Sequence, residues 1–315
     1  MTFRSTLATA FACALAIGAP KAEAEQFINV LTGGTSGVYY PLGVALSDIY
    51  AKGIPDVRTQ VQATKASVEN LNLIEQGKGE IAFTLGDALA LAWEGNEEAG
   101  FKAPLKKLRI VAAIYPNYVQ IAALREAGVT TVAELKGKSL SVGAAKSGTE
   151  LNARAILGAA GLSYDDLGKV EYLPFAESVE LMKNRQLEVT LQSSGLGNAA
   201  IKDLASSQAI SIVAIPADVA AAVGMPYMPA TIPAGTYQGQ DADVPTVAVG
   251  NYLVTSEDVP EEVVYQMTRL IFENLDVLKA AHSAGAGISL DEAAKNPPIP
   301  LHPGAERFYR EQGKL

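Results

Sequence analysis

Three short segments rich in glycine and hydroxyl side chains are the part of this sequence best suited to bind an anion. They read GGTSG at residues 33–37, TKAS at 64–67 and KSGTE at 146–150, and each lies between a β-forming run and an amphipathic run. The first turn of a helix has backbone N–H groups without intrahelical acceptors and carries the positive end of the helix dipole. Glycine allows a ligand to approach those groups closely. We therefore expect the three segments to begin helices that bind one anion together, without catalysis.

Nucleotide binding and catalysis have less support. The segment at 33–37 lacks the lysine of a phosphate-binding loop. A GLG run at 195–197, with Asp218 some way downstream, is similar to a dinucleotide fingerprint, but it is single and mid-chain, so we interpret its glycines as packing residues. His282 and His302 are the only histidines, and neither lies near a glycine-rich segment. We expect no metal and no cofactor. A binding protein is favoured over an enzyme, with an exported hydrolase that uses a cleft serine as the alternative.

The N-terminus has the features of a secretory signal. Arg4 precedes an apolar run at 7–19, and residues 22–24 supply small side chains at an A-x-A spacing. We predict cleavage after Ala24 and a location in the periplasm. The single cysteine, Cys13, lies inside this segment, so the mature chain has no thiol for a disulfide, a nucleophile or a metal ligand.

The composition restricts the partners. The chain has 315 residues and a net charge of −9, and removal of residues 1–24 makes that charge one unit more negative. Because nucleic-acid phosphates require clusters of Lys and Arg, an acidic chain without such clusters argues against nucleic acid. No stretch after the signal is long and apolar enough to cross a membrane. We expect a monomer that binds a small molecule.

Strand-forming and helix-forming runs alternate along the mature chain, which indicates βαβ units, mostly parallel sheets and an α/β fold. A single long helix is predicted at residues 260–282. The predicted strands lie at residues 27–33, 57–64, 80–86, 108–115, 119–124, 139–145, 169–175, 187–193, 210–216 and 246–255.

Two places along the chain have strands that could connect separate domains. The predicted strands at 108–115 and 119–124 have no helix between them, and the strand at 246–255 could return the chain to the first domain. We therefore predict a discontinuous first domain at 25–120 plus 250–315, a second domain at 121–249, and a two-strand hinge. The ligand cleft would lie between the domains, at the carboxyl ends of the strands.

Four motifs, in order along the chain, resemble those of the TAXI solute receptors. They are TGGTSGVYYPLG, SVENLNLIEQGKGEIAF, KSGTELNARAILGAAGL and FAESVELMKNRQLEV. TAXI receptors are the periplasmic binding proteins of one branch of the tripartite ATP-independent (TRAP) transporters. The resemblance implies a two-lobed, type II periplasmic-binding-protein-like fold. It also implies capture of a small carboxylate such as glutamate and its delivery to the membrane permease subunits of a TRAP transporter.

The same resemblance nominates ligand-binding residues in both lobes. Tyr115 and Ser193 are the weaker nominations, and Tyr115 and Phe175 could equally be aromatic residues of the core. The full set is Thr35, Ser36, Tyr39, Thr64, Ser67, Tyr115, Ser147, Thr149, Phe175 and Ser193.

Two lysines depart from the pattern of that family, which has small residues at these positions. If the lobes close, Lys65 and Lys146 could reach the cleft and contact a second carboxylate, which would favour a C4–C5 dicarboxylate. Alternatively, both side chains point to solvent. The remaining functional alternative is a binding protein of the same fold that serves an ATP-driven importer.

Overall fold

The computed structural model describes residues 26–315. The predicted signal peptide and its cleavage site after Ala24 lie outside this range. Ten strands form one mixed sheet in the order β2-β1-β3-β10-β4-β7-β5-β6, with β8 paired to β4 and β9 paired to β10. The strands are β1 (Gln26–Leu31), β2 (Val57–Gln62), β3 (Ile81–Leu85), β4 (Leu108–Leu124), β5 (Ser139–Ser141), β6 (Lys169–Glu171), β7 (Val189–Ser194), β8 (Ile210–Val213), β9 (Met228–Ile232) and β10 (Val244–Ser256).

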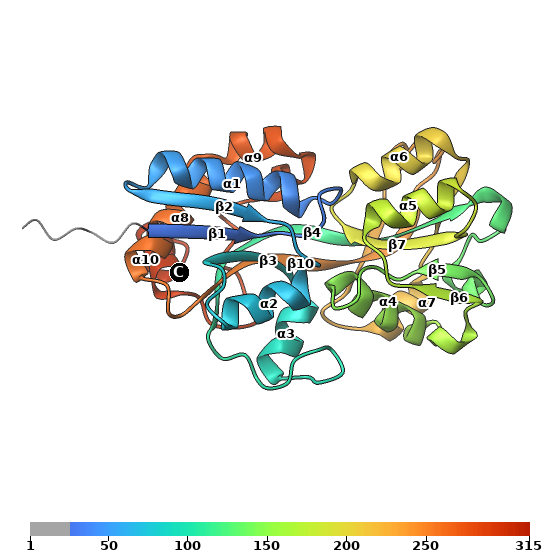
Figure 1. Cartoon of the computed structure of the whole chain (residues 1–315), viewed down its shortest axis with the longest axis horizontal. Coiled ribbons are helices and arrows are strands. Elements are labelled where there is room, and N and C mark those ends of the chain that lie inside the picture. The colour runs from blue at the N-terminus through green and yellow to red at the C-terminus, as the bar shows by residue number, and fades with distance from the viewer. Residues whose placement is uncertain (1–25) are drawn as a thin grey trace, which may run out of the picture.

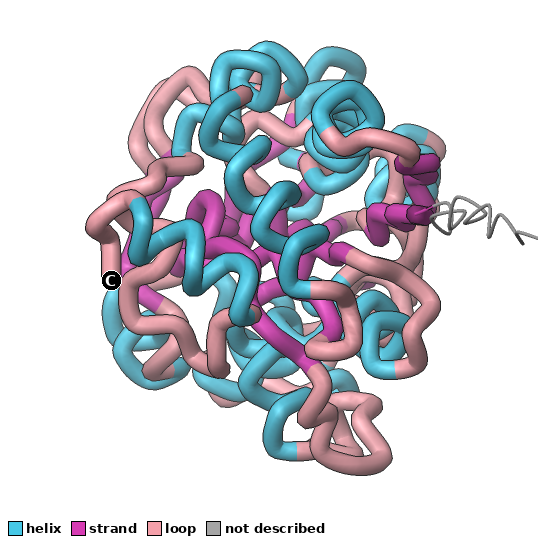
Figure 2. Tube along the Cα trace, turned by 90° about the vertical axis from the view of Figure 1, so that its left-hand side faces the viewer, coloured by secondary structure: helices cyan, strands magenta, loops and turns pink. Residues whose placement is uncertain are grey.

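Within residues 26–315, ten α-helices cover this sheet, and they lie on both sides of the strands (Figure 2). They are α1 (Tyr39–Gly53), α2 (Ser67–Glu75), α3 (Gly86–Glu94), α4 (Gly148–Ala159), α5 (Phe175–Lys183), α6 (Ala199–Ser207), α7 (Ala217–Val223), α8 (Glu261–Glu273), α9 (Leu275–Ala281) and α10 (Pro303–Glu311). The predicted α/β class is confirmed. Within residues 26–315, none of the helices combines the length and the hydropathy needed to span a bilayer.

The elements are grouped in two lobes (Figure 1). One lobe holds β1 to β3 with α1 to α3 and the C-terminal helices α8 to α10. The other holds β5 to β9 with α4 to α7. In the first lobe, β1 is parallel to both β2 and β3, so the loops that follow these strands meet at one edge of the sheet. That edge faces the second lobe (Figure 1).

Two long antiparallel strands, β4 and β10, run through both lobes (Figure 1). The sequence predicted two strands at 108–115 and 119–124, and this was wrong, because β4 is continuous over 17 residues. The pairing has an irregularity where Pro116 lies opposite Gly250, and the register shifts before Tyr252. Proline has no N–H for the ladder, so a bulge at this point is expected. The domain boundaries at 120 and 250 stay a prediction.

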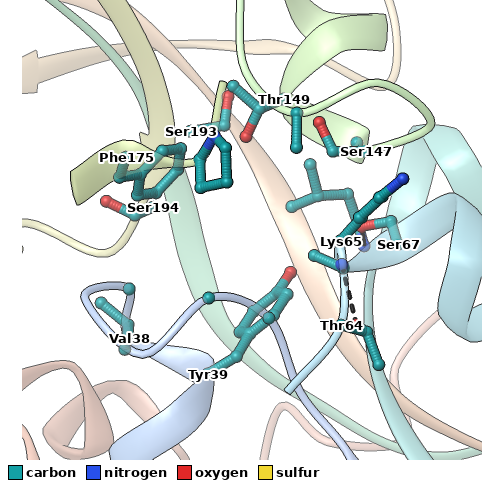
Figure 3. A pocket seen from close by; sticks show the side chains of 18 of the residues that line it. Val38, Tyr39, Thr64, Lys65, Ser67, Ser147, Thr149, Phe175, Ser193 and Ser194 are labelled. Carbon is teal, nitrogen blue, oxygen red and sulfur yellow. Dashed lines mark hydrogen bonds between the residues drawn. The ribbon is translucent and has the colours of Figure 1, made fainter. Parts of the chain in front are cut away.

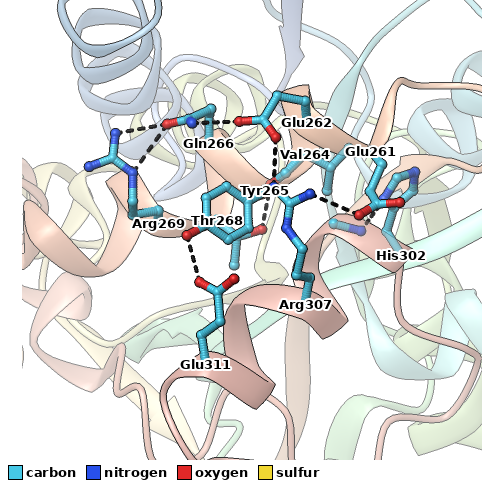
Figure 4. A network of polar contacts seen from close by, with 11 residues as sticks. Glu261, Glu262, Val264, Tyr265, Gln266, Thr268, Arg269, His302, Arg307 and Glu311 are labelled. Atoms are coloured by element: carbon cyan, nitrogen blue, oxygen red, sulfur yellow. Dashed lines mark hydrogen bonds and ion pairs between the residues drawn. The ribbon is translucent and has the colours of Figure 1, made fainter.

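The C-terminal helices support the hinge strand β4 from the first lobe. The predicted helix at 260–282 is in fact two helices, which meet at Asn274. Helix α10 packs on α8, and the Tyr309 hydroxyl donates to the carbonyl of Val111 on β4 at 2.8 Å. Arg307 on α10 forms ion pairs with Glu261 and Glu262 at the start of α8, at 3.0 and 2.7 Å, and these connect the two helices (Figure 4).

Candidate functional site: a cavity where four helices begin

A cavity of about 100 Å³ lies between the lobes. Its walls come from the loops and helix starts at residues 33–34, 36–39, 64–67, 144, 147–149 and 174–175. Strands also contribute to the lining: Leu85 at the end of β3, Asn117 in the middle of β4, and Ser193 and Ser194 at the end of β7. Tyr39 and Val38 form one side, Lys65, Ser67 and Thr64 a second, Ser147 and Thr149 a third, and Phe175 lies beside Ser193 and Ser194 (Figure 3).

Four helices begin at the cavity, two from each lobe: α1 and α2 from the first, α4 and α5 from the second. Their ends are close together. A side-chain carbon on Gly148 would lie 2.6 Å from Oγ of Ser67, and one on Gly37 would lie 3.8 Å from the Phe175 ring. Each helix start has N–H groups without an intrahelical acceptor, and its dipole favours negative charge. Contacts across both pairs of helix ends show that the lobes are closed on each other.

The charge of the lining also suits an anion. Among residues 26–315, no Asp or Glu lines the cavity, and Lys65 is the single lysine or arginine that does. The Lys65 side chain is exposed at the rim. Burial raises the pKa of the Tyr39 hydroxyl, so this group stays neutral. The described lining therefore places donors and one positive charge around the cavity, with no carboxylate to repel an anion.

Nine of the twelve residues predicted as ligand contacts line the cavity. Their roles in binding stay a prediction. They are Ser36, Tyr39, Thr64, Lys65, Ser67, Ser147, Thr149, Phe175 and Ser193.

The other three lie outside the lining. Thr35 is exposed beside it. Lys146 is exposed as well, and its backbone has a φ of 62°. The next residue, Ser147, is the N-cap of α4. Tyr115 is buried in the core of the first lobe, 3% exposed, in close contact with Gly195 and Gly287. Tyr115 is therefore the core aromatic that the sequence allowed as an alternative.

The hydroxyl groups of the lining differ in function. The Thr64 hydroxyl accepts from the Ala66 N–H at 2.9 Å and lies 2.6 Å from Oδ1 of Asn70, so it holds the loop before α2 in place. Ser147 accepts from the Glu150 N–H at 3.1 Å, as expected of an N-cap, which leaves its own hydrogen free to donate. Ser147 is thus the better ligand donor of the two.

Asn117 is a lining residue that the sequence analysis missed. The Asn251 side chain fixes its orientation, because Nδ2 of Asn251 donates to the Tyr115 carbonyl at 3.0 Å and to Oδ1 of Asn117 at 3.1 Å. A carbonyl only accepts, so the Asn251 amide cannot be reversed, and Asn117 must turn its Oδ1 toward it. Nδ2 of Asn117 is then left buried without an acceptor among residues 26–315, in the lining of the cavity. A polar side chain between two apolar strand segments was the signal that could have identified it.

Neither histidine lines the cavity. His302 caps α10, where Nδ1 accepts from the Gly304 N–H at 3.1 Å and Nε2 lies 3.0 Å from the Val259 carbonyl. His282 accepts from the Ala284 N–H at 3.0 Å. Burial lowers the pKa of both rings, which suits the neutral form that a cap requires. The hydrolase alternative therefore has no histidine base at this cavity in the described part of the chain.

The comparison with protein families gives a different family from the one expected. Residues 30–313 match the NMT1-like family. The chain belongs to the NMT1-like family. Its identification as a TAXI receptor of a TRAP transporter was wrong, and the expectation of glutamate or a dicarboxylate, which depended on it, is withdrawn. The four motifs that carried that resemblance include glycine- and hydroxyl-rich turns, and many helix starts that bind anions need such turns.

Solved structures of binding proteins share the fold of this NMT1-like chain. PhnD1 from Prochlorococcus marinus, in complex with methylphosphonate, matches with a TM-score of 0.58 at 12% identity, over 92% of this chain and 100% of that one. The ligand-binding component of an ABC-type import system from Staphylococcus aureus, with zinc bound, matches with a TM-score of 0.53 at 11% identity, over 92% and 100%. The predicted two-lobed, type II periplasmic-binding-protein-like fold is confirmed.

Proposed function

We propose that this NMT1-like chain is the exported ligand-binding subunit of an ATP-driven importer, and that it captures a small organic oxyanion by closing its lobes. One observation carries the proposal: four helices from two lobes begin at a cavity whose lining has no carboxylate. Export is supported by the predicted signal at residues 1–24. The structural similarity to the ligand-binding component of an ABC-type import system supports an ATP-driven partner over the permease of a TRAP transporter.

The arrangement of donors favours a tetrahedral head group. Helix ends from opposite lobes, the Ser147 hydroxyl and Nδ2 of Asn117 approach the cavity from several directions. A phosphonate or sulfonate has three oxygens that point in different directions, and so can accept from all of these donors. A planar carboxylate has two oxygens in one plane. Methylphosphonate, the ligand in the PhnD1 complex, has this tetrahedral chemistry.

The size of the cavity limits the ligand. An apolar cavity of about 150 Å³ holds benzene, and the cavity here is about 100 Å³. The closed lobes therefore fit a ligand of about six non-hydrogen atoms or fewer. Methylphosphonate and methanesulfonate fall within that limit.

Titration calorimetry of the mature protein with methylphosphonate and methanesulfonate tests the proposal. We expect saturable binding of at least one of them. Lys65→Ala should weaken this binding up to about fivefold, and more at low salt, because its exposed ammonium contributes only a screened attraction. Lys146→Ala is the matched control, since Lys146 lies outside the lining, and it should bind like the parent. Absence of binding by both oxyanions would contradict the proposed function.

A further inference from the structure

Ser193 lines the cavity from the end of β7, and its hydroxyl is part of a buried network. Its Oγ lies 2.5 Å from Oδ1 of Asn152 on α4. Nδ2 of Asn152 in turn lies 2.6 Å from a carboxylate oxygen of Asp87 and 2.8 Å from the Tyr227 hydroxyl. Asp87 is the second residue of α3 in the first lobe, whereas the other three residues belong to the second lobe.

The direction of each hydrogen bond in this network follows from Asp87. Oδ2 of Asp87 accepts from two donors, the Tyr227 hydroxyl at 2.7 Å and Nδ2 of Asn152. The Asn152 amide must also turn its Nδ2 toward these two residues, which leaves its Oδ1 facing Ser193. The side chains of Asp87, Asn152 and Tyr227 are all buried, so the alternative orientation would have no water to satisfy it.

Ser193 can therefore offer only an acceptor to the cavity. A serine hydroxyl has one hydrogen, and here that hydrogen is donated to Asn152. Oγ of Ser193 is thus an acceptor in this cavity, whereas Nδ2 of Asn117 in the same cavity is an unused donor. A fully deprotonated oxyanion can satisfy Asn117 but has no hydrogen to donate to Ser193.

The two groups are close enough for one small ligand to contact both. β4 and β7 are antiparallel neighbours, with Val119 opposite Ser193 and Tyr118 opposite Ser194. By extension of this register, Asn117 lies opposite residue 195, so Asn117 and Ser193 are diagonal neighbours on one face of the sheet. Diagonal neighbours are about 7–8 Å apart.

We propose that the ligand carries a hydroxyl group next to its anionic head, and that this hydroxyl donates to Ser193 while the head group accepts from Asn117 and the helix ends. This inference rests on the proposed oxyanion function and specifies its substrate class as hydroxylated organic oxyanions. A hydroxyl fits better than an ammonium group, because an ammonium group has three hydrogens to satisfy and Ser193 is a single acceptor.

Calorimetry with a matched pair of probes tests this inference. Hydroxymethylphosphonate and methylphosphonate differ by one hydroxyl when both are dianions, and at a pH where both are fully deprotonated the parent protein should bind the hydroxylated probe about two- to tenfold more tightly. In Ser193→Ala this ratio should fall to about the value of one expected without a hydrogen bond. Ser206→Ala, an exposed serine on α6, is the control and should keep the parent's ratio.

The outcomes separate the two proposals. Equal binding of both probes by the parent, or an unchanged ratio in Ser193→Ala, overturns the hydroxyl inference and leaves the oxyanion function standing. If neither probe binds, the hydroxyl inference is overturned, and the oxyanion function is overturned with it if methanesulfonate also fails to bind. The ratio measured on the parent requires no variant, so the test stands even if Ser193→Ala fails to fold. A thermal unfolding curve of that variant reports whether it folds.

Discussion

The side-chain amides of Asn251 and Asn117 are hydrogen-bonded across the two hinge strands, with 3.1 Å between Nδ2 of the first and Oδ1 of the second. Asn251 also accepts from the Tyr39 hydroxyl at 2.5 Å through its own Oδ1. Tyr39 is the first residue of α1, and its ring stacks on Phe83 with 4.9 Å between the centroids. One network therefore connects a helix start, both hinge strands and the free donor in the cavity.

Replacement of Asn117 by Asp is expected to weaken oxyanion binding about 10- to 150-fold. The variant keeps the oxygen that accepts from Asn251 but replaces the free donor by a second carboxylate oxygen. A hydrogen bond to a charged group contributes roughly 1.5–3 kcal/mol, and this change removes it and adds repulsion. Calorimetry with methylphosphonate measures the loss.

Asn184→Asp is the matched control, because it adds the same charge at the exposed end of α5, outside the lining of the cavity. It should bind like the parent. If Asn117→Asp also bound methylphosphonate like the parent, Asn117 would have no contact with the ligand.

A methyl group at residue 148 is expected to prevent full closure. Gly148 begins α4, and a Cβ there would lie 2.6 Å from Oγ of Ser67 and 2.7 Å from Cδ1 of Leu85, both in the opposite lobe. Overpacking of this kind costs about 1–3 kcal/mol, so Gly148→Ala should weaken ligand binding about 5- to 150-fold. Small-angle scattering should also show a larger radius of gyration than for the parent.

Gly158→Ala, on the same helix, is the control for this substitution. No atom lies within 4 Å of a Cβ at this position, and the residue is exposed. This variant should bind like the parent, with a free energy of unfolding up to about 1 kcal/mol higher, since alanine favours a helix over glycine. A Gly148→Ala protein with the parent's affinity and scattering curve would show that the lobes do not need this contact to bind ligand.

Local sequence patterns predicted the parts of this molecule that local physics determines. Glycine and hydroxyl residues at 33–37, 64–67 and 146–150 do precede helices, because capping and tight turns depend on neighbouring residues. Together with the predicted fold class, the same patterns predicted that Ser67 and Ser147 lie at one cavity, and both line it. The family identification from four motifs was wrong, because residues 30–313 match the NMT1-like family.

The residues that the sequence did not reveal depend on contacts between distant segments. Asn117 became a candidate only when its partner Asn251, on another strand, was placed beside it. Tyr115 is two residues away and would share a face with Asn117 in a regular strand, but the pairing of β4 with β10 is irregular at this point and Tyr115 packs in the core. The orientation of Ser193 depends on Asp87, which is 106 residues earlier in the chain, and no local pattern contains that information.

Asp87 is a buried carboxyl group at the contact between the lobes. Burial raises the pKa of its carboxyl group above the ordinary value of 3.8, although donors from Tyr227 and Asn152 partly offset this effect. Oδ1 of Asp87 has no partner among the described residues. The folded, closed protein therefore binds a proton at Asp87 more tightly than the unfolded chain does.

Stability should change with pH in a direction that this raised pKa determines. Proton binding to Asp87 favours the folded state, so its contribution is fully present below the unfolded pKa and is lost as the pH rises through the higher folded pKa. In Asp87→Asn this contribution is absent. The free energy of unfolding of the parent, minus that of Asp87→Asn, should therefore increase as the pH falls from about 8 to about 4. Urea titrations of both proteins across that range measure the difference.

Asp87→Ala should be less stable than the parent throughout, since it leaves the Asn152 and Tyr227 donors unpaired at about 1–3 kcal/mol each. A difference between the parent and Asp87→Asn that stays constant or decreases on acidification would contradict the burial of an ionised Asp87 between the lobes.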